Sequence, residues 1–202
     1  RMLNEEFGKL SNKEIKDLIE IVTKDSERLY ALLENLLSWA NSQTGKLKAN
    51  KVNIFLNNMV SEIIQLYISS ANKKNIELEI NISKSIIVVF DEFMLNTILR
   101  NLISNAIKFS NSGSIISLTA IEQNNSILLL VKDSGVGIKE GNLKKIFTEG
   151  SNFSEPGTNN EKGTGIGLML CHNFVKQNGG DISVDSKYGE GTTFTITLQK
   201  GE

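Results

Sequence analysis

The chain has 202 residues, of which 40% are hydrophobic and 22% are charged, and its formal net charge at pH 7 is −1. These values are typical of a globular protein with one full domain and an appendage, and they give no reason to expect a nucleic acid or an anionic membrane surface as partner. The single cysteine, Cys171, excludes an internal disulfide and favours a reducing compartment.

The first 41 residues are predicted to be mainly helical. Residues 1 to 9 resemble an incomplete helix that ends near Gly8, and Ser11 with Glu14 forms a capping box at the start of a longer helix to about Asn41. Its apolar residues follow a heptad-like seam: Ile15, Leu18, Val22, Leu29, Leu32, Leu36 and Trp39. A single amphipathic helix cannot bury such a seam. The helix therefore either packs on its own domain or belongs to a hairpin that dimerises into a four-helix bundle.

Residues 42 to 50 form a short polar linker that contains Gly45, and we expect the domain boundary there. Beyond the linker, hydrophobic periodicity predicts a strand, a helix and two further strands. Their expected ranges are Val52–Ile54, Leu56–Ala71, Ile76–Ile82 and Ile86–Phe90.

The next helix, from Asp91 to Ser110, has apolar pairs that recur from Met94 and Leu95 to Ala106 and Ile107, and Asp91 can cap it. Three polar residues lie off this apolar stripe at positions i, i+4 and i+7, so they share one face of the helix. They are Asn101, Asn105 and Lys108.

The second half of the chain is predicted to contain two hairpins and one helix. Ile115–Ile121 and Ser126–Lys132 form the first hairpin, in which the apolar run Ile127–Val131 indicates a central strand buried on both faces. A helix then runs to about Gln177, and the last hairpin turns at Tyr188–Gly191. Three helices on one face of a mostly antiparallel sheet make an α+β fold, a two-layer α/β sandwich.

Two glycine clusters bracket a polar segment from Thr148 to Lys162. The first is Asp133-Ser134-Gly135-Val136-Gly137-Ile138, and the second is Gly163-Thr164-Gly165-Ile166-Gly167-Leu168, which leads directly into a helix. Glycines allow a close backbone approach to a ligand, and N–H groups at a helix N-terminus bind phosphate oxygens. The segment between them has few apolar anchors beyond Phe153, so we expect a lid that is mobile without ligand.

Together these segments resemble the nucleotide-binding boxes of histidine kinases. Residues 101–109 resemble the N box, residues 133–138 the G1 box, Phe147 and Phe153 the F-box region, and residues 163–168 the G2 box. Their order and spacing match over roughly residues 50 to 200, which implies the Bergerat ATP-binding fold.

The resemblance also implies a division of the chain into two domains. Leu33–Ala40 is similar to the second helix of the histidine-kinase dimerisation domain. Residues 1–43 would then be part of a dimerisation and phosphoacceptor hairpin, and residues 51–202 would be the ATP-binding catalytic domain.

ATP and Mg²⁺ are the implied ligands. Asp133 would accept a hydrogen bond from the adenine amino group, and Thr192 would help to hold both this carboxylate and the adenine through water. Asn105 would be the Mg²⁺ ligand and Lys108 would contact a phosphate. The other expected nucleotide-binding residues are Asn101, Gly135, Gly137, Ile138, Phe147, Gly163, Thr164, Gly165, Ile166, Gly167 and Leu168.

Two positions bear on the reaction. Related ATPases carry a glutamate, the general base for water, where this chain has Asn101, so hydrolysis as the main activity is disfavoured. His172 is the only histidine, and it lacks the following acid of the family's acceptor motif. We interpret it as a surface or packing residue and expect the acceptor upstream of Arg1, so this chain should not phosphorylate itself.

The implied partners are the receiver domain of a response regulator and, in a full-length protein, a second copy bound through the hairpin. No stretch reaches the roughly 18 apolar residues of a membrane span. We therefore expect a cytoplasmic location and no nucleic acid partner, with any membrane attachment made through segments outside this chain. The alternatives are a Bergerat ATPase, a non-catalytic module that holds ATP or docks a regulator, and an anti-sigma-type serine/threonine kinase, which lacks the long seam helix.

Overall fold

The computed structural model describes residues 11, 13–19, 21–23, 26, 48–148, 155–161, 163 and 165–202. The chain divides into two compact units, residues 1–40 and residues 41–202. In the first unit, residues 13–19 and 21–23 are helical. The predicted capping box is present, because Ser11 N donates to Glu14 Oε2 at 2.8 Å and Glu14 N donates to Ser11 Oγ at 3.3 Å. Hydrogen bonds from Ser11 hold the pKa of Glu14 below its usual value.

The apolar seam can be followed only at its start. Of its described residues, Ile15 and Leu18 are half-buried and Val22 is more than half exposed in this chain. Leu29, Leu32, Leu36 and Trp39 lie outside the described residues.

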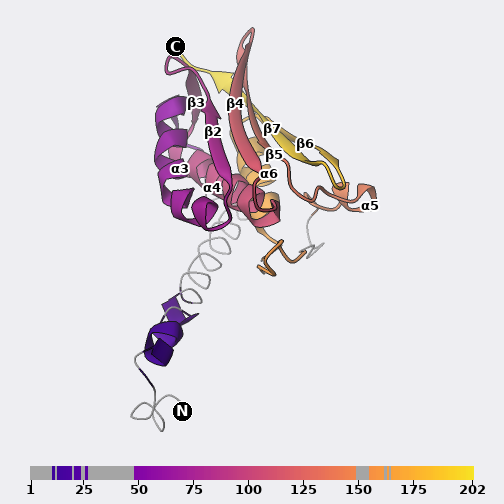
Figure 1. Cartoon of the computed structure of the whole chain (residues 1–202). Coiled ribbons are helices and arrows are strands. Elements are labelled where there is room, and N and C mark those ends of the chain that lie inside the picture. Colours follow the sequence, from indigo (N-terminus) through magenta and orange to yellow (C-terminus); the bar gives the residue numbers. More distant parts are fainter. Residues whose placement is uncertain are drawn as a thin grey trace. The chain divides into compact units, whose positions relative to one another are not determined.

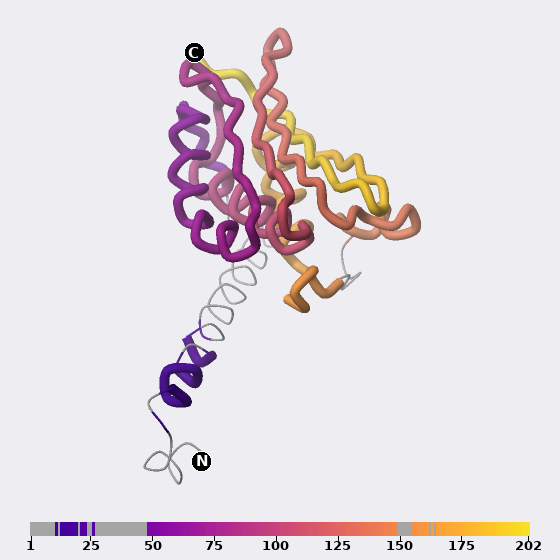
Figure 2. The backbone as a smooth tube through the Cα atoms, viewed as in Figure 1, coloured from indigo at the N-terminus to yellow at the C-terminus, as the bar shows by residue number. Residues whose placement is uncertain are grey.

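The second unit contains a seven-stranded mixed sheet in the order β1-β3-β7-β5-β4-β2, with β6 also paired to β7 (Figures 1 and 2). Only the β2–β4 pair is parallel among the pairings of the described strands. β7 has β5 along one edge, and β6 and β3 share the other. The strands are β1 Lys51–Phe55, β2 Glu77–Asn81, β3 Ile87–Asp91, β4 Ile115–Gln123, β5 Ser126–Asp133, β6 Asp181–Lys187 and β7 Gly191–Lys200.

Three helices gather on one face of this sheet (Figure 1). They are α3 Leu56–Lys73, α4 Glu92–Phe109 and α6 Gly167–Gln177, and a short helix, α5 Glu140–Leu143, lies in the connection after β5. Asp91 caps α4 as predicted, since its Oδ1 accepts from Met94 N at 2.9 Å. The apolar stripe of α4 is fully buried, and so is Cys171 on α6, where burial raises the thiol pKa to about 12.

β5 is central, as predicted, but it is not buried on both faces. Ile127, Leu129 and Val131 are fully buried, whereas Leu128 and Leu130 on the opposite face are only half-buried. The helices cover one face of the sheet, and the apolar run gave no sign that the other face would remain partly open. The α+β sandwich itself is confirmed.

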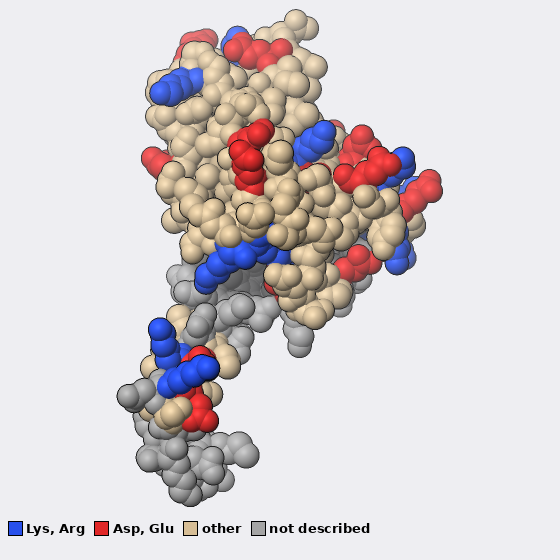
Figure 3. Space-filling model, in the orientation of Figure 1, with Lys and Arg blue, Asp and Glu red and all other residues tan. Residues whose placement is uncertain are grey.

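The surface carries no dominant charge in the view of Figure 3, where acidic and basic side chains stand in small interspersed groups on a mostly uncharged surface. None of the described helices combines the length and the apolar character that crossing a bilayer requires.

Candidate functional site

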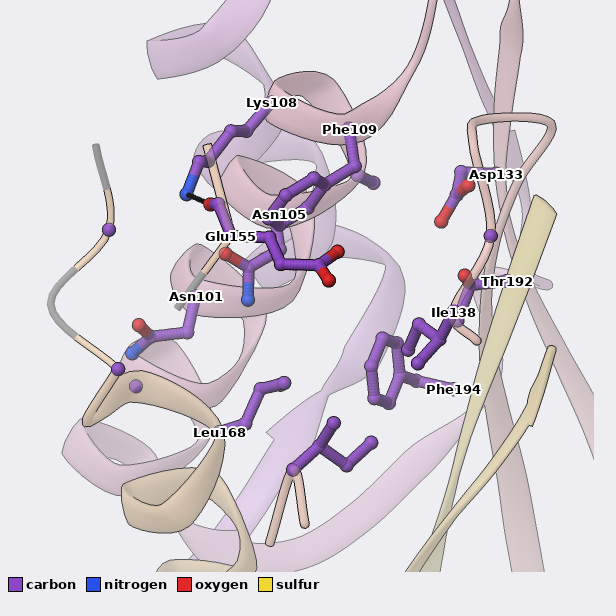
Figure 4. A pocket seen from close by; sticks show the side chains of 16 residues that line it. Asn101, Asn105, Lys108, Phe109, Asp133, Ile138, Glu155, Leu168, Thr192 and Phe194 are labelled. Carbon is purple, nitrogen blue, oxygen red and sulfur yellow. Dashed lines mark hydrogen bonds between the residues drawn. The ribbon is translucent and has the colours of Figure 1, made fainter. Parts of the chain in front are cut away.

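A pocket lies between α4 and the adjoining ends of β5 and β7 (Figure 4). Six separate stretches of the chain contribute to its wall. The lining residues are Asn101, Asn105, Ala106, Lys108, Phe109, Asp133, Gly137, Ile138, Ile146, Glu155, Gly163, Gly165, Gly167, Leu168, Thr192 and Phe194.

Asp133 supplies a buried carboxylate at the end of β5, where its exposed fraction is 6%. Burial raises its pKa to about 6, although hydrogen bonds from the backbone of Gly135 and Thr192 oppose the increase. The bond from Gly135 N to Asp133 Oδ1 is 2.9 Å long. Because most of this group is still ionised at neutral pH, it can accept a hydrogen bond from an amino group of a ligand.

The loop after Asp133 is confined on two sides. A Cβ atom on Gly135 would collide with the carbonyl oxygen of Phe109, and one on Gly137 would collide with the carbonyl of Lys187. Gly137 also has a φ of +66°, a conformation that L side chains rarely adopt. Glycine is therefore required at both positions for the loop to pass between α4 and the β6–β7 turn.

Ser186 joins this loop to β7, although no feature of the sequence indicated it. Its Oγ accepts from Ile138 N at 2.9 Å, donates to Gly191 O at 2.8 Å and lies 2.9 Å from Thr192 Oγ1. The hydroxyl of Thr192 is thus held at the pocket beside Asp133 (Figure 4).

The polar face of α4 forms the opposite wall, and all three of its predicted residues line the pocket. Asn101 Nδ2 donates to Thr97 O at 2.9 Å, and a Cβ atom on Gly167 would collide with the Asn101 amide oxygen. Asn105 points into the pocket (Figure 4), where its amide oxygen suits a hard cation. Lys108 Nζ donates to Glu155 O at 3.1 Å.

The N-terminus of α6 closes one end of the pocket. Gly163, Gly165, Gly167 and Leu168 line it, and Gly165 has a φ of +74°. The N-cap residue of α6 is Ile166, whose side chain makes no cap hydrogen bond, and N–H groups in the first turn of a helix are suited to binding an anion.

Four predicted site residues are not among those lining the pocket. Gly135 contributes indirectly, because its N–H group donates a hydrogen bond to the lining residue Asp133. Ile166 is the residue immediately before α6. The centre of the Phe147 ring lies 6.4 Å from the centre of the Phe194 ring, so Phe147 packs against a residue that lines the pocket. Thr164 lies outside the described residues.

Five lining residues were missed: Ala106, Phe109, Ile146, Glu155 and Phe194. Phe194 could have been found, because it follows Thr192 by two residues and so shares its face of β7. Glu155 has no local signal, since it reaches the pocket only through the path of a loop.

Residues 90–202 match the family described as histidine kinase-, DNA gyrase B-, and HSP90-like ATPase. The chain is 34% identical over 192 residues to the autoinducer 2 sensor kinase/phosphatase LuxQ of Vibrio cholerae, covering 93% of this chain and 22% of LuxQ. It is 31% identical over 189 residues to the sensor protein SrrB of Staphylococcus aureus, covering 94% of this chain and 32% of SrrB. The chain thus spans a third or less of the length of these relatives.

The fold is similar to that of the histidine kinase ThkA in its complex with the response regulator TrrA. The TM-score is 0.74 at 22% sequence identity, and the match covers 99% of this chain and 55% of the ThkA chain.

Proposed function

Because this chain belongs to the histidine kinase-, DNA gyrase B- and HSP90-like ATPase family and carries the ATP-binding catalytic domain of a sensor histidine kinase, we propose that it transfers the γ-phosphate of ATP to a histidine upstream of this domain. The observation that supports this best is the placement of three groups around one pocket: the Asp133 carboxylate, the Asn105 amide and the N-terminus of α6. An adenine amino group, a hydrated cation and a phosphate chain need these three kinds of partner in one site.

In this proposal different residues bind different parts of the nucleotide. Asp133 and Thr192 hold the adenine, while Lys108 and the N–H groups at the start of α6 hold phosphate oxygens. Asn105 fits Mg²⁺, because it carries an amide oxygen and lines the pocket from the helix that also carries Lys108. When bound, Mg²⁺ neutralises phosphate charge, so the protein's own contribution is mainly positioning.

Asn101 favours transfer to a side chain over hydrolysis. Its amide nitrogen is bonded to Thr97 O and its amide oxygen packs against Gly167, so both ends of the group have structural contacts. An amide is also a poor proton acceptor compared with a carboxylate. We therefore place a histidine, rather than water, as the acceptor, for relay to a response regulator.

We extend the proposal to partners. ThkA is bound to the response regulator TrrA in its complex, and we expect a receiver domain to receive the phosphate here also. Ile15 and Leu18 are only half-buried and Val22 is exposed, so this seam suits burial against a second copy of the helical hairpin in a full-length homodimer. We also place this domain in the cytoplasm, with any membrane segment outside these residues.

The proposal is tested with labelled ATP and a separate acceptor. The chain should bind ATP with Mg²⁺ and transfer acid-labile ³²P to a dimerisation helix that carries a histidine followed by an acid. It should not label itself, because His172 lies on α6 itself, about 7.5 Å along the axis from Gly167 at 1.5 Å per residue.

The control is His172→Gln, which should label the separate helix as well as the unmodified protein does. Acid-labile phosphate on the chain itself that disappears in this variant would contradict the proposed acceptor. Release of inorganic phosphate without label on any acceptor would favour an ATPase.

A separate prediction concerns Glu155, whose carboxylate points into the pocket (Figure 4). Without a cation, like charges separated by a few ångströms repel by about 1 kcal/mol in water. Glu155→Gln should therefore raise the affinity for ATP in EDTA by about fivefold, with a smaller change when Mg²⁺ is present. Calorimetric titrations in EDTA and in Mg²⁺ measure both values, with Glu140→Gln on α5 as the control. An equal change under the two conditions would disprove the charge argument.

A further inference from the structure

The C-terminal end of α4 is a junction between two walls of the pocket. The last carbonyl groups of a helix have no partner within it and must find others. Phe109 O accepts from Val136 N of the loop after β5 at 3.0 Å, and Lys108 O accepts from Thr158 N at 3.0 Å. Two loops of the site are therefore attached to neighbouring carbonyls of one helix.

A lysine from α3's end completes this junction. Lys74 Nζ donates to Ile107 O at 2.9 Å, Lys108 O at 3.0 Å and Thr158 Oγ1 at 2.8 Å, and it pairs with Glu161 Oε1 at 2.8 Å. The Lys74 side chain is only 9% exposed. Burying an ammonium group is costly unless it is paired, and here a carboxylate and the negative end of α4 both stabilise it.

Residues 155–161 are shaped to fit against this group. Gly157 N donates to Glu161 O at 2.9 Å, and a Cβ atom on Gly157 would collide with the Glu161 carboxylate and with Lys108. Burial acts to raise the pKa of Glu161, but the hydrogen bonds from Lys74 and from nearby backbone N–H groups hold it below its usual value. Residues 155–161 of the expected lid are therefore held by hydrogen bonds and an ion pair, and not by the apolar contacts that this segment lacks.

We propose that Lys74 is a positioning residue of the nucleotide site: Lys74, Thr158 and Glu161, here called the Lys74 clasp, hold residues 155–161 on the end of α4 and so place Glu155 and Lys108. This rests on the proposed ATP-binding function. Lys108 Nζ binds the carbonyl of Glu155, and the Glu155 side chain lines the pocket. Because the clasp holds residues 155–161 on the end of α4, nucleotide binding would have less of the expected lid to order and would lose less affinity to that entropy.

Lys74→Met tests the clasp, since it keeps the length of the side chain and removes its charge and donors. We expect amide exchange at Thr158 to accelerate by at least about tenfold, as the loss of hydrogen bonds to a charged group predicts, and ATP affinity to fall by about tenfold. Leu129 in β5 reports global unfolding and should change less than Thr158. Lys73→Met is the matched control, because Lys73 is the exposed neighbour on α3, and it should leave both values unchanged.

Restoring the ammonium group separates positioning from a general loss of stability. Lys74→Cys followed by aminoethylation replaces one methylene with sulfur, and the fully buried Cys171 is shielded from the reagent. ATP affinity and protection of Thr158 should return together. Equal acceleration at Thr158 and Leu129, or protection that returns without ATP affinity, would overturn the proposal. If the unmodified protein bound no ATP, the proposed function would fail, and exchange at Thr158 would still decide whether Lys74 holds the segment.

Discussion

Asp133→Asn is expected to remove most of the nucleotide affinity while making the ligand-free protein more stable at neutral pH. The buried carboxylate has a pKa of about 6 in the folded protein against 3.8 for the unperturbed group. The folded protein binds the proton more tightly, so this group's contribution to stability is greatest below about pH 4 and declines as the pH rises through about 6. The difference between these two pKa values corresponds to a change of about 3 kcal/mol in the free energy of unfolding.

The amide of the Asp133→Asn variant carries no charge, and its oxygen can still accept the hydrogen bond from Gly135 N. The thermal midpoint of the variant should therefore exceed that of the unmodified protein at pH 7.5, and the difference should shrink toward pH 4. Thermal denaturation over this pH range measures it. Asp185→Asn, at an exposed position of β6, should show no such trend.

ATP and ADP should both bind Asp133→Asn about ten- to a hundredfold more weakly, the range that loss of a charged hydrogen bond predicts. Both nucleotides carry the adenine that Asp133 is proposed to bind, so their affinities should fall by similar factors in calorimetric titrations. A loss confined to ATP would show that Asp133 acts on the phosphates instead.

Asn105→Ala should abolish the gain in ATP affinity that Mg²⁺ provides, a loss of at least about tenfold by comparison with changes around other metal sites. The thermal midpoint of the ligand-free protein should stay nearly the same, because Asn105 is half-buried at the pocket and lies off the apolar stripe. Titrations with ATP in EDTA and in Mg²⁺ provide the comparison. Ser104→Ala, at the exposed neighbouring position of α4, is the control. Equal magnesium dependence in Asn105→Ala and the unmodified protein would rule out Asn105 as the ligand.

The local elements could be predicted because their signals are local. The Asp91 cap and the apolar pairs of α4 are set by a helix period of 3.6 residues, and the alternation of Ile182, Phe194 and Ile196 by a strand period of 2. The same reasoning placed three polar residues on one face of α4, and all three line the pocket. The glycine clusters predicted close approach of the backbone to a ligand, whereas the close contacts of Gly135 and Gly137 are with the protein's own carbonyl groups, those of Phe109 and Lys187.

The sequence by itself determined these periods, caps, hairpins and glycine positions, whereas the tertiary structure alone decided which elements distant in sequence are neighbours. The residue patterns of β3, β5 and β7 do not indicate that β7 pairs with β3 and with β5. Lys74 and Thr158 are 84 residues apart, and Glu155 belongs to the segment that their contact helps to hold at the pocket. Leu128 and Leu130 are as apolar as Leu129, yet they stay half-buried because the helices cover one face of the sheet. A periodic pattern records which face of an element is apolar, but the layer that covers that face comes from other parts of the chain.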